Sequence, residues 1–240
     1  MKQEKDFERQ AATILKYLRS DMRYDLEKIP RPFFIELTGS PSAGKTTVIT
    51  ELDKFFRRQG FRVWRPQEGA EVIRHIPRTT PDYNTRTGLY ALSILLDESY
   101  RHGYDIIIFD RAVFDAYGWM MYWEGKGLLT PEQRMIFQQF FLSDFWVHKI
   151  DMAYFMISSP EVAMQRELKI ALSSKLGETT NPATVKTLVD RYMAAYTQLS
   201  PRFPQLRLMD TTHLGEQEMV AQVATEILDA MESKALQNSR

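Results

Sequence analysis

The apolar residues of this chain fall into two alternating patterns. Short runs that are almost wholly apolar or aromatic are typical of strands buried on both faces, and they occupy residues 33–38, 61–64, 105–109, 152–157 and 206–209. Between these runs, apolar residues recur every three or four positions, which is the spacing of one helix face. Strands that alternate with helices in this way predict an α/β fold around a five-stranded, mainly parallel sheet.

Capping residues predict where several helices begin. Residues 130–133 supply an N-cap threonine, a proline in the first turn and a glutamine at the third position, so we expect one long helix to run from there to about His148. Asn181 followed by Pro182 predicts a further helix start. A final helix is expected from Glu216 to about Met231.

An amphipathic helix is expected over residues 4–20, before the first strand. Basic residues do not dominate its polar face, which favours packing of its apolar stripe on the domain rather than on a membrane. We therefore expect an N-terminal helical extension at 1–31, one main domain at 32–232 and a polar tail at 233–240.

Composition excludes several kinds of chemistry. The 240 residues include 31 Lys plus Arg and 31 Asp plus Glu, and this zero net charge disfavours a nucleic-acid partner. The absence of cysteine excludes disulfides, thiolate catalysis and Cys-ligated metals. A charged start and the lack of any 18-residue apolar run predict a soluble, cytoplasmic protein that does not enter a membrane.

One motif is highly specific. Residues 39–46 match the phosphate-binding pattern G-x-x-x-x-G-K-[ST] at every fixed position, between a predicted strand and a predicted helix. Its glycines let backbone N–H groups point at phosphate oxygens, while Lys45 would reach the β- and γ-phosphates and Thr46 would ligate Mg²⁺. The sequence therefore predicts a three-layer P-loop NTPase fold that binds ATP and Mg²⁺. The predicted nucleotide-binding residues are Gly39, Ser40, Pro41, Ser42, Ala43, Gly44, Lys45, Thr46 and Thr47.

Asp110 is a second candidate metal ligand, beside Thr46. It follows the apolar run 105–109, so it would lie at the sheet edge from which the phosphate loop emerges. There it could hold Mg²⁺ directly or through water. The alternative is that Asp110 caps the helix expected at 112–121, and both roles are compatible.

The residues around Asp110 resemble a known group of kinases. The motifs N-K-x-D and Leu-Ser-Gly-Gly-Gln are absent, which disfavours a GTPase switch or a transporter ATPase. The stretch 109–117 instead resembles the D/E-R motif of the thymidylate kinase and deoxynucleoside kinase group of P-loop kinases. Weaker similarities occur at 65–70, 159–166 and 210–212, and the resemblance covers about residues 33–230. It implies a helical lid at about 168–181.

The resemblance also implies roles for individual residues. Asp110 would lie near the metal, Arg111 would face the phosphoryl acceptor, and Glu68 would accept the proton of the acceptor's 5′-hydroxyl. In this sequence Glu68 stands in a Pro-Gln-Glu order instead of the group's Glu-Pro order, and the lid segment contains no arginine. The remaining candidates for neutralising the transferred phosphoryl group are Arg166, Lys169 and Arg191.

The acceptor pocket is expected between Glu68 and Arg86 and in the region after Arg111. Cationic, titratable and aromatic side chains crowd this part of the chain: Arg74, His75, Arg78, Tyr83, Arg86 and Tyr90. They would bind a phosphorylated acceptor and stack on a base, or else form a solvated surface loop. Four aromatic residues of the next helix are expected in the core: Tyr117, Trp119, Tyr122 and Trp123. Arg111 and Asp115 are spaced as a helical ion pair.

Three classes of function remain open at this stage. The first is ATP- and Mg²⁺-dependent phosphoryl transfer to a nucleoside, a nucleotide or a similar small acceptor. The second is a nucleotide-binding regulatory module with weak hydrolysis. The third is a kinase that acts on a polynucleotide or a modified base. The sequence leaves open whether the chain forms a homodimer.

Overall fold

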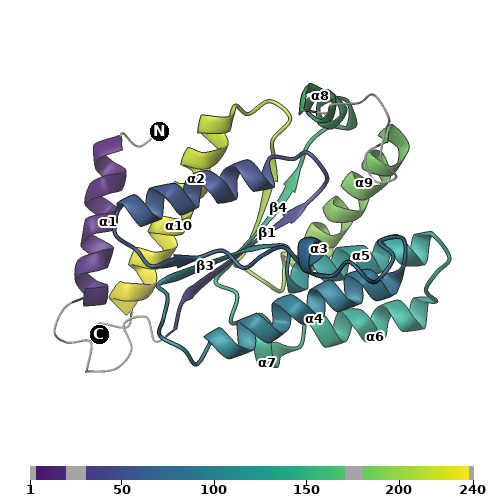
Figure 1. The fold of residues 1–240 in the computed structure, drawn as a ribbon, viewed down its shortest axis with the longest axis horizontal. Coiled ribbons are helices and arrows are strands. Elements are labelled where there is room, and N and C mark those ends of the chain that lie inside the picture. The colour runs from purple at the N-terminus through teal and green to yellow at the C-terminus, as the bar shows by residue number, and fades with distance from the viewer. Residues whose placement is uncertain (1–3, 20–30, 171–180, 238–240) are drawn as a thin grey trace.

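A computed structural model describes residues 4–19, 31–170 and 181–237 (Figure 1). Its centre is one sheet in the order β2-β3-β1-β4-β5, and every neighbouring pair is parallel. The strands are β1 (Phe33–Gly39), β2 (Val63–Trp64), β3 (Ile106–Asp110), β4 (Met152–Ile157) and β5 (Leu206–Asp210). The α/β prediction is confirmed, with all five strands parallel.

Helices cover both faces of this sheet and make a three-layer fold. Figure 1 shows α1 (Glu4–Arg19), α2 (Lys45–Arg58) and α10 (Glu216–Gln237) on one face. The other face carries α4 (Pro81–Glu98), α5 (Val113–Gly125), α6 (Pro131–Phe141) and α9 (Pro182–Leu199). The remaining described helices are α3 (Gly69–Val72), α7 (Asp144–Val147) and α8 (Pro160–Ile170).

Alternate residues of β1 contribute to two separate apolar cores. Phe33, Ile35 and Leu37 pack with α1, α2 and α10, while Phe34 packs with α4, α5 and α9. Because both faces of the strand are covered, its apolar residues form a nearly continuous run and do not alternate with polar ones. The polar residues Glu36 and Thr38 interrupt this run, and both are fully buried in the strand.

The N-terminal helix packs on the domain, as its apolar stripe predicts. Ala11 and Ile14 are fully buried against the core that α10 shares. Gln10 Nε2 donates to the carboxylates of Asp229 and Glu232 on α10, each at 2.8 Å. These contacts help to explain why α10 continues beyond the predicted end at Met231.

The single helix predicted from residue 131 to His148 is wrong. α6 ends at Phe141, the chain turns at Leu142 and Ser143, and the short helix α7 follows. Phe141, Leu142, Val147 and Ile150 are all buried, and one straight helix would have spread these four side chains around its circumference. The turn brings all of them to the core. The predicted capping box at Thr130 is confirmed.

Most of the lid segment predicted at 168–181 lies outside the described residues. The structure includes its first residues, in α8, and Asn181 at its end. The Asn181 side chain accepts a hydrogen bond from the backbone of Thr184 at 3.0 Å, so the predicted start of α9 is confirmed. The short helix α3 was not predicted.

Candidate active site

The phosphate loop connects β1 to α2 and requires its glycines. Gly39 has a φ of 133°, and a Cβ atom there would lie 1.8 Å from the carbonyl oxygen of Met156. Gly44, with a φ of 90°, precedes α2. The loop therefore curls tightly, and the N-terminus of α2 presents its positive end toward the space that a phosphate would occupy.

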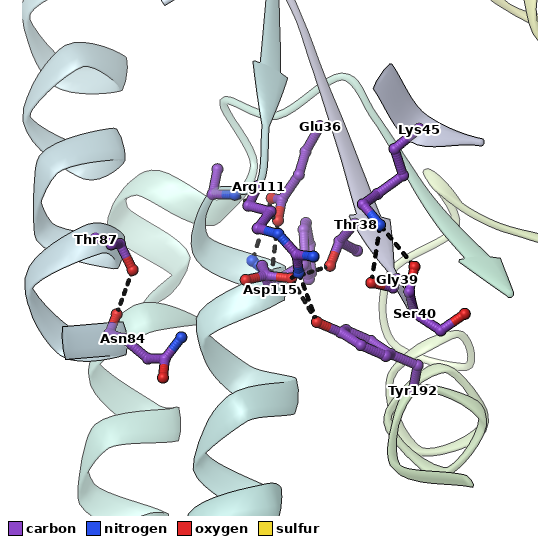
Figure 2. A network of polar contacts seen from close by, with 12 residues as sticks. Glu36, Thr38, Gly39, Ser40, Lys45, Asn84, Thr87, Arg111, Asp115 and Tyr192 are labelled. Carbon is purple, nitrogen blue, oxygen red and sulfur yellow. Dashed lines mark hydrogen bonds and ion pairs between the residues drawn. The ribbon is translucent and has the colours of Figure 1, made fainter. Parts of the chain in front are cut away.

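Lys45 lies across this loop. Its Nζ donates to the carbonyl oxygens of Gly39 at 3.1 Å and Ser40 at 2.7 Å, and the residue is only 7% exposed (Figure 2). Burial, followed by the nearby positive charge of Arg111, lowers the pKa of Lys45 to about 7. Lys45 is thus a buried amine that loses its charge more readily than an exposed lysine.

Asp110 and Arg111 lie beside the loop because β1 and β3 are neighbours. Leu37 of β1 is paired with Asp110, and the backbone N–H of Arg111 donates to the carbonyl oxygen of Leu37 at 3.0 Å. Arg111 has a φ of 70°, in the left-handed region that costs a non-glycine residue on the order of 1–3 kcal/mol. The Asp-Arg pair therefore occupies a constrained turn at the carboxyl edge of the sheet.

The carboxylate that caps α5 is Glu36, so the capping alternative for Asp110 is wrong. Glu36 accepts backbone N–H bonds from Ala112 at 2.9 Å, Phe114 at 3.1 Å and Asp115 at 2.8 Å. Burial, together with the neighbouring charge of Asp115, raises the pKa of Glu36 to about 8. Sequence reasoning missed Glu36, although a lone acid inside an apolar strand was a signal.

The donor set at this edge fits a magnesium ion that is bound together with a nucleotide. Mg²⁺ in such sites takes one or two protein oxygens, with phosphate and water oxygens completing its shell. Asp110 ends β3, and Thr46 lies in the first turn of α2, which follows the neighbouring strand β1, so their side-chain oxygens could supply the protein ligands. Among the residues that the structure describes, no cluster of three or more His, Asp or Glu side chains could hold a metal without such a nucleotide.

Arg111 is the centre of a buried polar cluster (Figure 2). Its Nη1 donates to Asp115 Oδ1 at 2.8 Å and to Tyr192 Oη at 2.9 Å. The expected ion pair with Asp115 is confirmed, but it is not a pair within one helix, because Arg111 precedes α5. Burial alone would lower the pKa of Arg111, but the carboxylates of Asp115, Asp110 and Glu68 raise it well above its usual range. Arg111 therefore remains charged. Sequence reasoning missed Tyr192 because it lies 81 positions away in the chain.

The structure brings Glu68 and Arg111 together. Glu68 precedes α3, and its Oε1 is 3.5 Å from Arg111 Nε. The Glu68 side chain is 31% exposed. Burial, reinforced by the nearby charge of Asp110, raises the pKa of Glu68. A carboxylate with a raised pKa at the mouth of a pocket can act as a general base.

Arg166 of α8 contacts the phosphate loop from the other side. It donates to the carbonyl oxygen of Ser42 at 3.2 Å and to the hydroxyl and carbonyl oxygens of Thr211 at 3.0 and 2.7 Å. The Ser42 hydroxyl donates to Glu167 at 3.0 Å. Of the other candidate clamps, Arg191 lies against Gly125 at the end of α5.

A cleft of about 820 Å³, including space open to solvent, adjoins this cluster. Glu68, Asp110, Arg111 and Asp115 line one part of it, and residues of α4 line another. Of the crowded side chains expected here, the lining includes Arg78, Tyr83 and Tyr90.

The aromatic residues of α5 divide between core and cleft. Tyr122 and Trp123 are buried in the core, as expected, whereas Trp119 also lines the cleft. Trp123 Nε1 donates to Asn84 Oδ1 at 2.9 Å. The hydroxyl of Tyr83 and Nε1 of Trp119 are buried without a hydrogen-bond partner in the described structure, and both residues line the cleft.

The architecture defines this chain as a protein with a P-loop kinase fold. It is similar to a deoxyadenosine kinase from M. mycoides, solved with the products dCMP and dCDP, with a TM-score of 0.60 and 16% sequence identity. The similarity covers 82% of this chain and 100% of that one, and it confirms the fold expected from the resemblance to deoxynucleoside kinases. By sequence, no family model and no curated protein matches this chain.

No helix in the described part of the chain is both long and apolar enough to cross a membrane.

Proposed function

We propose that this protein is a kinase that transfers the γ-phosphoryl group of Mg²⁺-ATP to a hydroxyl group of a nucleoside, a nucleotide or a similar small acceptor. The observation that carries the proposal is the meeting of two sites at one sheet edge. The phosphate loop with Lys45 lies next to a cleft that contains Asp110, Arg111 and Glu68. Two substrates bound in these sites would have their reacting groups side by side.

The donor side of the site is built to hold polyphosphate. The loop N–H groups, the N-terminus of α2 and Lys45 would bind the phosphates, and Thr46 with Asp110 would hold the metal. Bound Mg²⁺ supplies charge neutralisation at the phosphate oxygens. Arg166 supports the loop through its bond to the Ser42 carbonyl oxygen and would add positive charge for neutralising the transferred group.

The acceptor side supplies a base and a positive charge. Glu68 would take the proton from the attacking hydroxyl, and its raised pKa makes it a better proton acceptor than an ordinary carboxylate. Arg111 would stabilise the negative charge on the transferred group, because it stays charged and its guanidinium borders the cleft.

Labelled ATP, Mg²⁺ and a panel of nucleosides and nucleotides test this proposal. The expected result is a labelled product with at least one acceptor, at a rate at least a hundredfold above that of Lys45→Ala. Tight ATP binding without transfer to any acceptor would contradict the proposal and favour a nucleotide-binding regulatory module. Transfer only to oligonucleotides would favour a polynucleotide kinase.

A further inference from the structure

Arg111 has a fixed backbone but a long side chain that must still be oriented. Its left-handed backbone is held by the bond from its N–H to Leu37, and the N–H of the next residue, Ala112, is held by Glu36. These bonds place the Cα atom but leave the side-chain torsions free. An arginine that is to meet a phosphoryl group in one geometry needs further contacts.

Nη1 and Nε of the guanidinium make these contacts. Nη1 donates to Asp115 Oδ1 and to Tyr192 Oη, which uses both of its N–H groups. Nε faces Glu68 Oε1 at 3.5 Å, at the border of the cleft. The side chain is 24% exposed, so part of the guanidinium can reach a ligand in the cleft.

The partners of Arg111 are themselves tightly held. Asp115 Oδ1 also accepts from Thr38 Oγ1 at 2.5 Å and from Tyr192 Oη at 2.7 Å. Thr38, Asp115 and Tyr192 are all at least 95% buried. The cluster therefore does not exchange freely with water, and each hydroxyl has a defined direction.

Tyr192 has the most specific place in this cluster. Its hydroxyl donates to Asp115 and accepts from Arg111, so the same oxygen contacts both members of the ion pair. It stays a donor, because burial, followed by the charge of Asp115, raises its pKa well above the usual range. Its ring also packs at the edge of Phe155 and beside Gly118, which fixes the position of the hydroxyl.

We propose that Tyr192 is a positioning residue for Arg111: with Asp115 and Thr38, its hydroxyl holds the guanidinium in the orientation that meets the transferred phosphoryl group. The role of Arg111 in transfer rests on the proposed function, whereas its immobilisation does not. Tyr192 reaches this cluster from α9, whereas Thr38 belongs to β1, Arg111 follows β3 and Asp115 belongs to α5.

Nitrogen NMR of the arginine side chains tests the immobilisation without any substrate. In the wild type, hindered rotation should give Arg111 separate Nη1 and Nη2 signals, which Arg111→Lys identifies by their loss. Tyr192→Phe should merge these signals. Tyr196→Phe, a matched loss of a hydroxyl one turn along α9, should leave them resolved. Signals that remain resolved in Tyr192→Phe overturn the proposal.

Steady-state kinetics then test the consequence for transfer. Tyr192→Phe should lower kcat about tenfold to a hundredfold with little change in the KM for ATP, since small misplacements of a charged group can cost that much. Thr38→Val should lower kcat in the same way, and Thr38→Ser, which restores the hydroxyl, should recover most of it. Unchanged kcat in Tyr192→Phe overturns the proposal. A wild type that transfers no phosphoryl group refutes the proposed function instead, and the NMR comparison still decides the immobilisation.

Discussion

Binding of ATP should take up a proton, and Lys45 should be the group that takes it. In the free protein the pKa of Lys45 is lowered to about 7, chiefly by burial. At pH 8 a group with that pKa is only about 10% protonated. A bound triphosphate would place negative charge against Nζ and raise its pKa back toward the ordinary value of about 10.4.

The size of the effect follows from these two states. At pH 8 Lys45 should take up about 0.9 proton on binding, and at pH 6 only about 0.1, because it is then already charged. Between pH 7 and pH 9 the affinity should fall by about fiftyfold in total, and the slope should approach tenfold per pH unit only above pH 8, where Lys45 is mostly neutral in the free protein. A terminal phosphate with a pKa of about 6 is fully ionised in this range and contributes little.

Calorimetric titration with ATP in buffers of different ionisation enthalpy measures the proton count directly. Lys45→Met keeps the length of the side chain and should reduce the uptake at pH 8 to near zero. Tight binding by the wild type with an uptake below about 0.2 proton at pH 8 would refute the reasoning, because Lys45 would then be fully charged before ATP arrives.

Three further substitutions give distinct expected results. Glu68→Gln should lower the transfer rate by about 10²- to 10⁴-fold while ATP binding persists. It should also remove the part of the kcat/KM profile that rises with pH, because that rise reflects ionisation of Glu68 at its raised pKa. An unchanged profile would exclude Glu68 as the base. Asp110→Asn should raise the Mg²⁺ concentration needed for half-maximal activity at least about tenfold. The affinity for nucleotide, measured by titration without metal, should stay within about threefold of wild type. An unchanged Mg²⁺ requirement would exclude Asp110 as a ligand. Gly39→Ala should destabilise the fold by about 3 kcal/mol or more, because the added Cβ would meet the Met156 carbonyl. The Tm should then fall by roughly 6–12 °C. An unchanged Tm would contradict the geometry of the loop.

The sequence predicted those features that depend on neighbouring residues. The five strands were visible because each is a short, mainly apolar run, and the phosphate loop was visible because its residues are contiguous. The place of Asp110 at the carboxyl end of a strand was predicted for the same reason, whereas the left-handed backbone of Arg111 was not predicted. In each case, the chemistry and its structural context lie within about ten residues.

Features that depend on packing between distant elements were not predictable in this way. Tyr192 and Thr38 meet Asp115 across 77 positions each, and nothing local marks either residue as part of a site. The break between α6 and α7 arises because the core accepts Phe141 and Val147 together, which helix periodicity does not show. Glu36 lies between these cases, because its charge stood out but its partners did not.

The central claim is that the cleft beside Arg111 receives a phosphoryl acceptor. The most direct measurement is the rate of ADP formation from Mg²⁺-ATP with and without the acceptor selected from the panel, in the wild type and in Arg111→Lys. The account predicts ADP formation that depends on the acceptor, is matched one to one by phosphorylated acceptor, and falls at least about a hundredfold in the variant. ADP formation that is equal with and without every acceptor, or unchanged in Arg111→Lys, would contradict it.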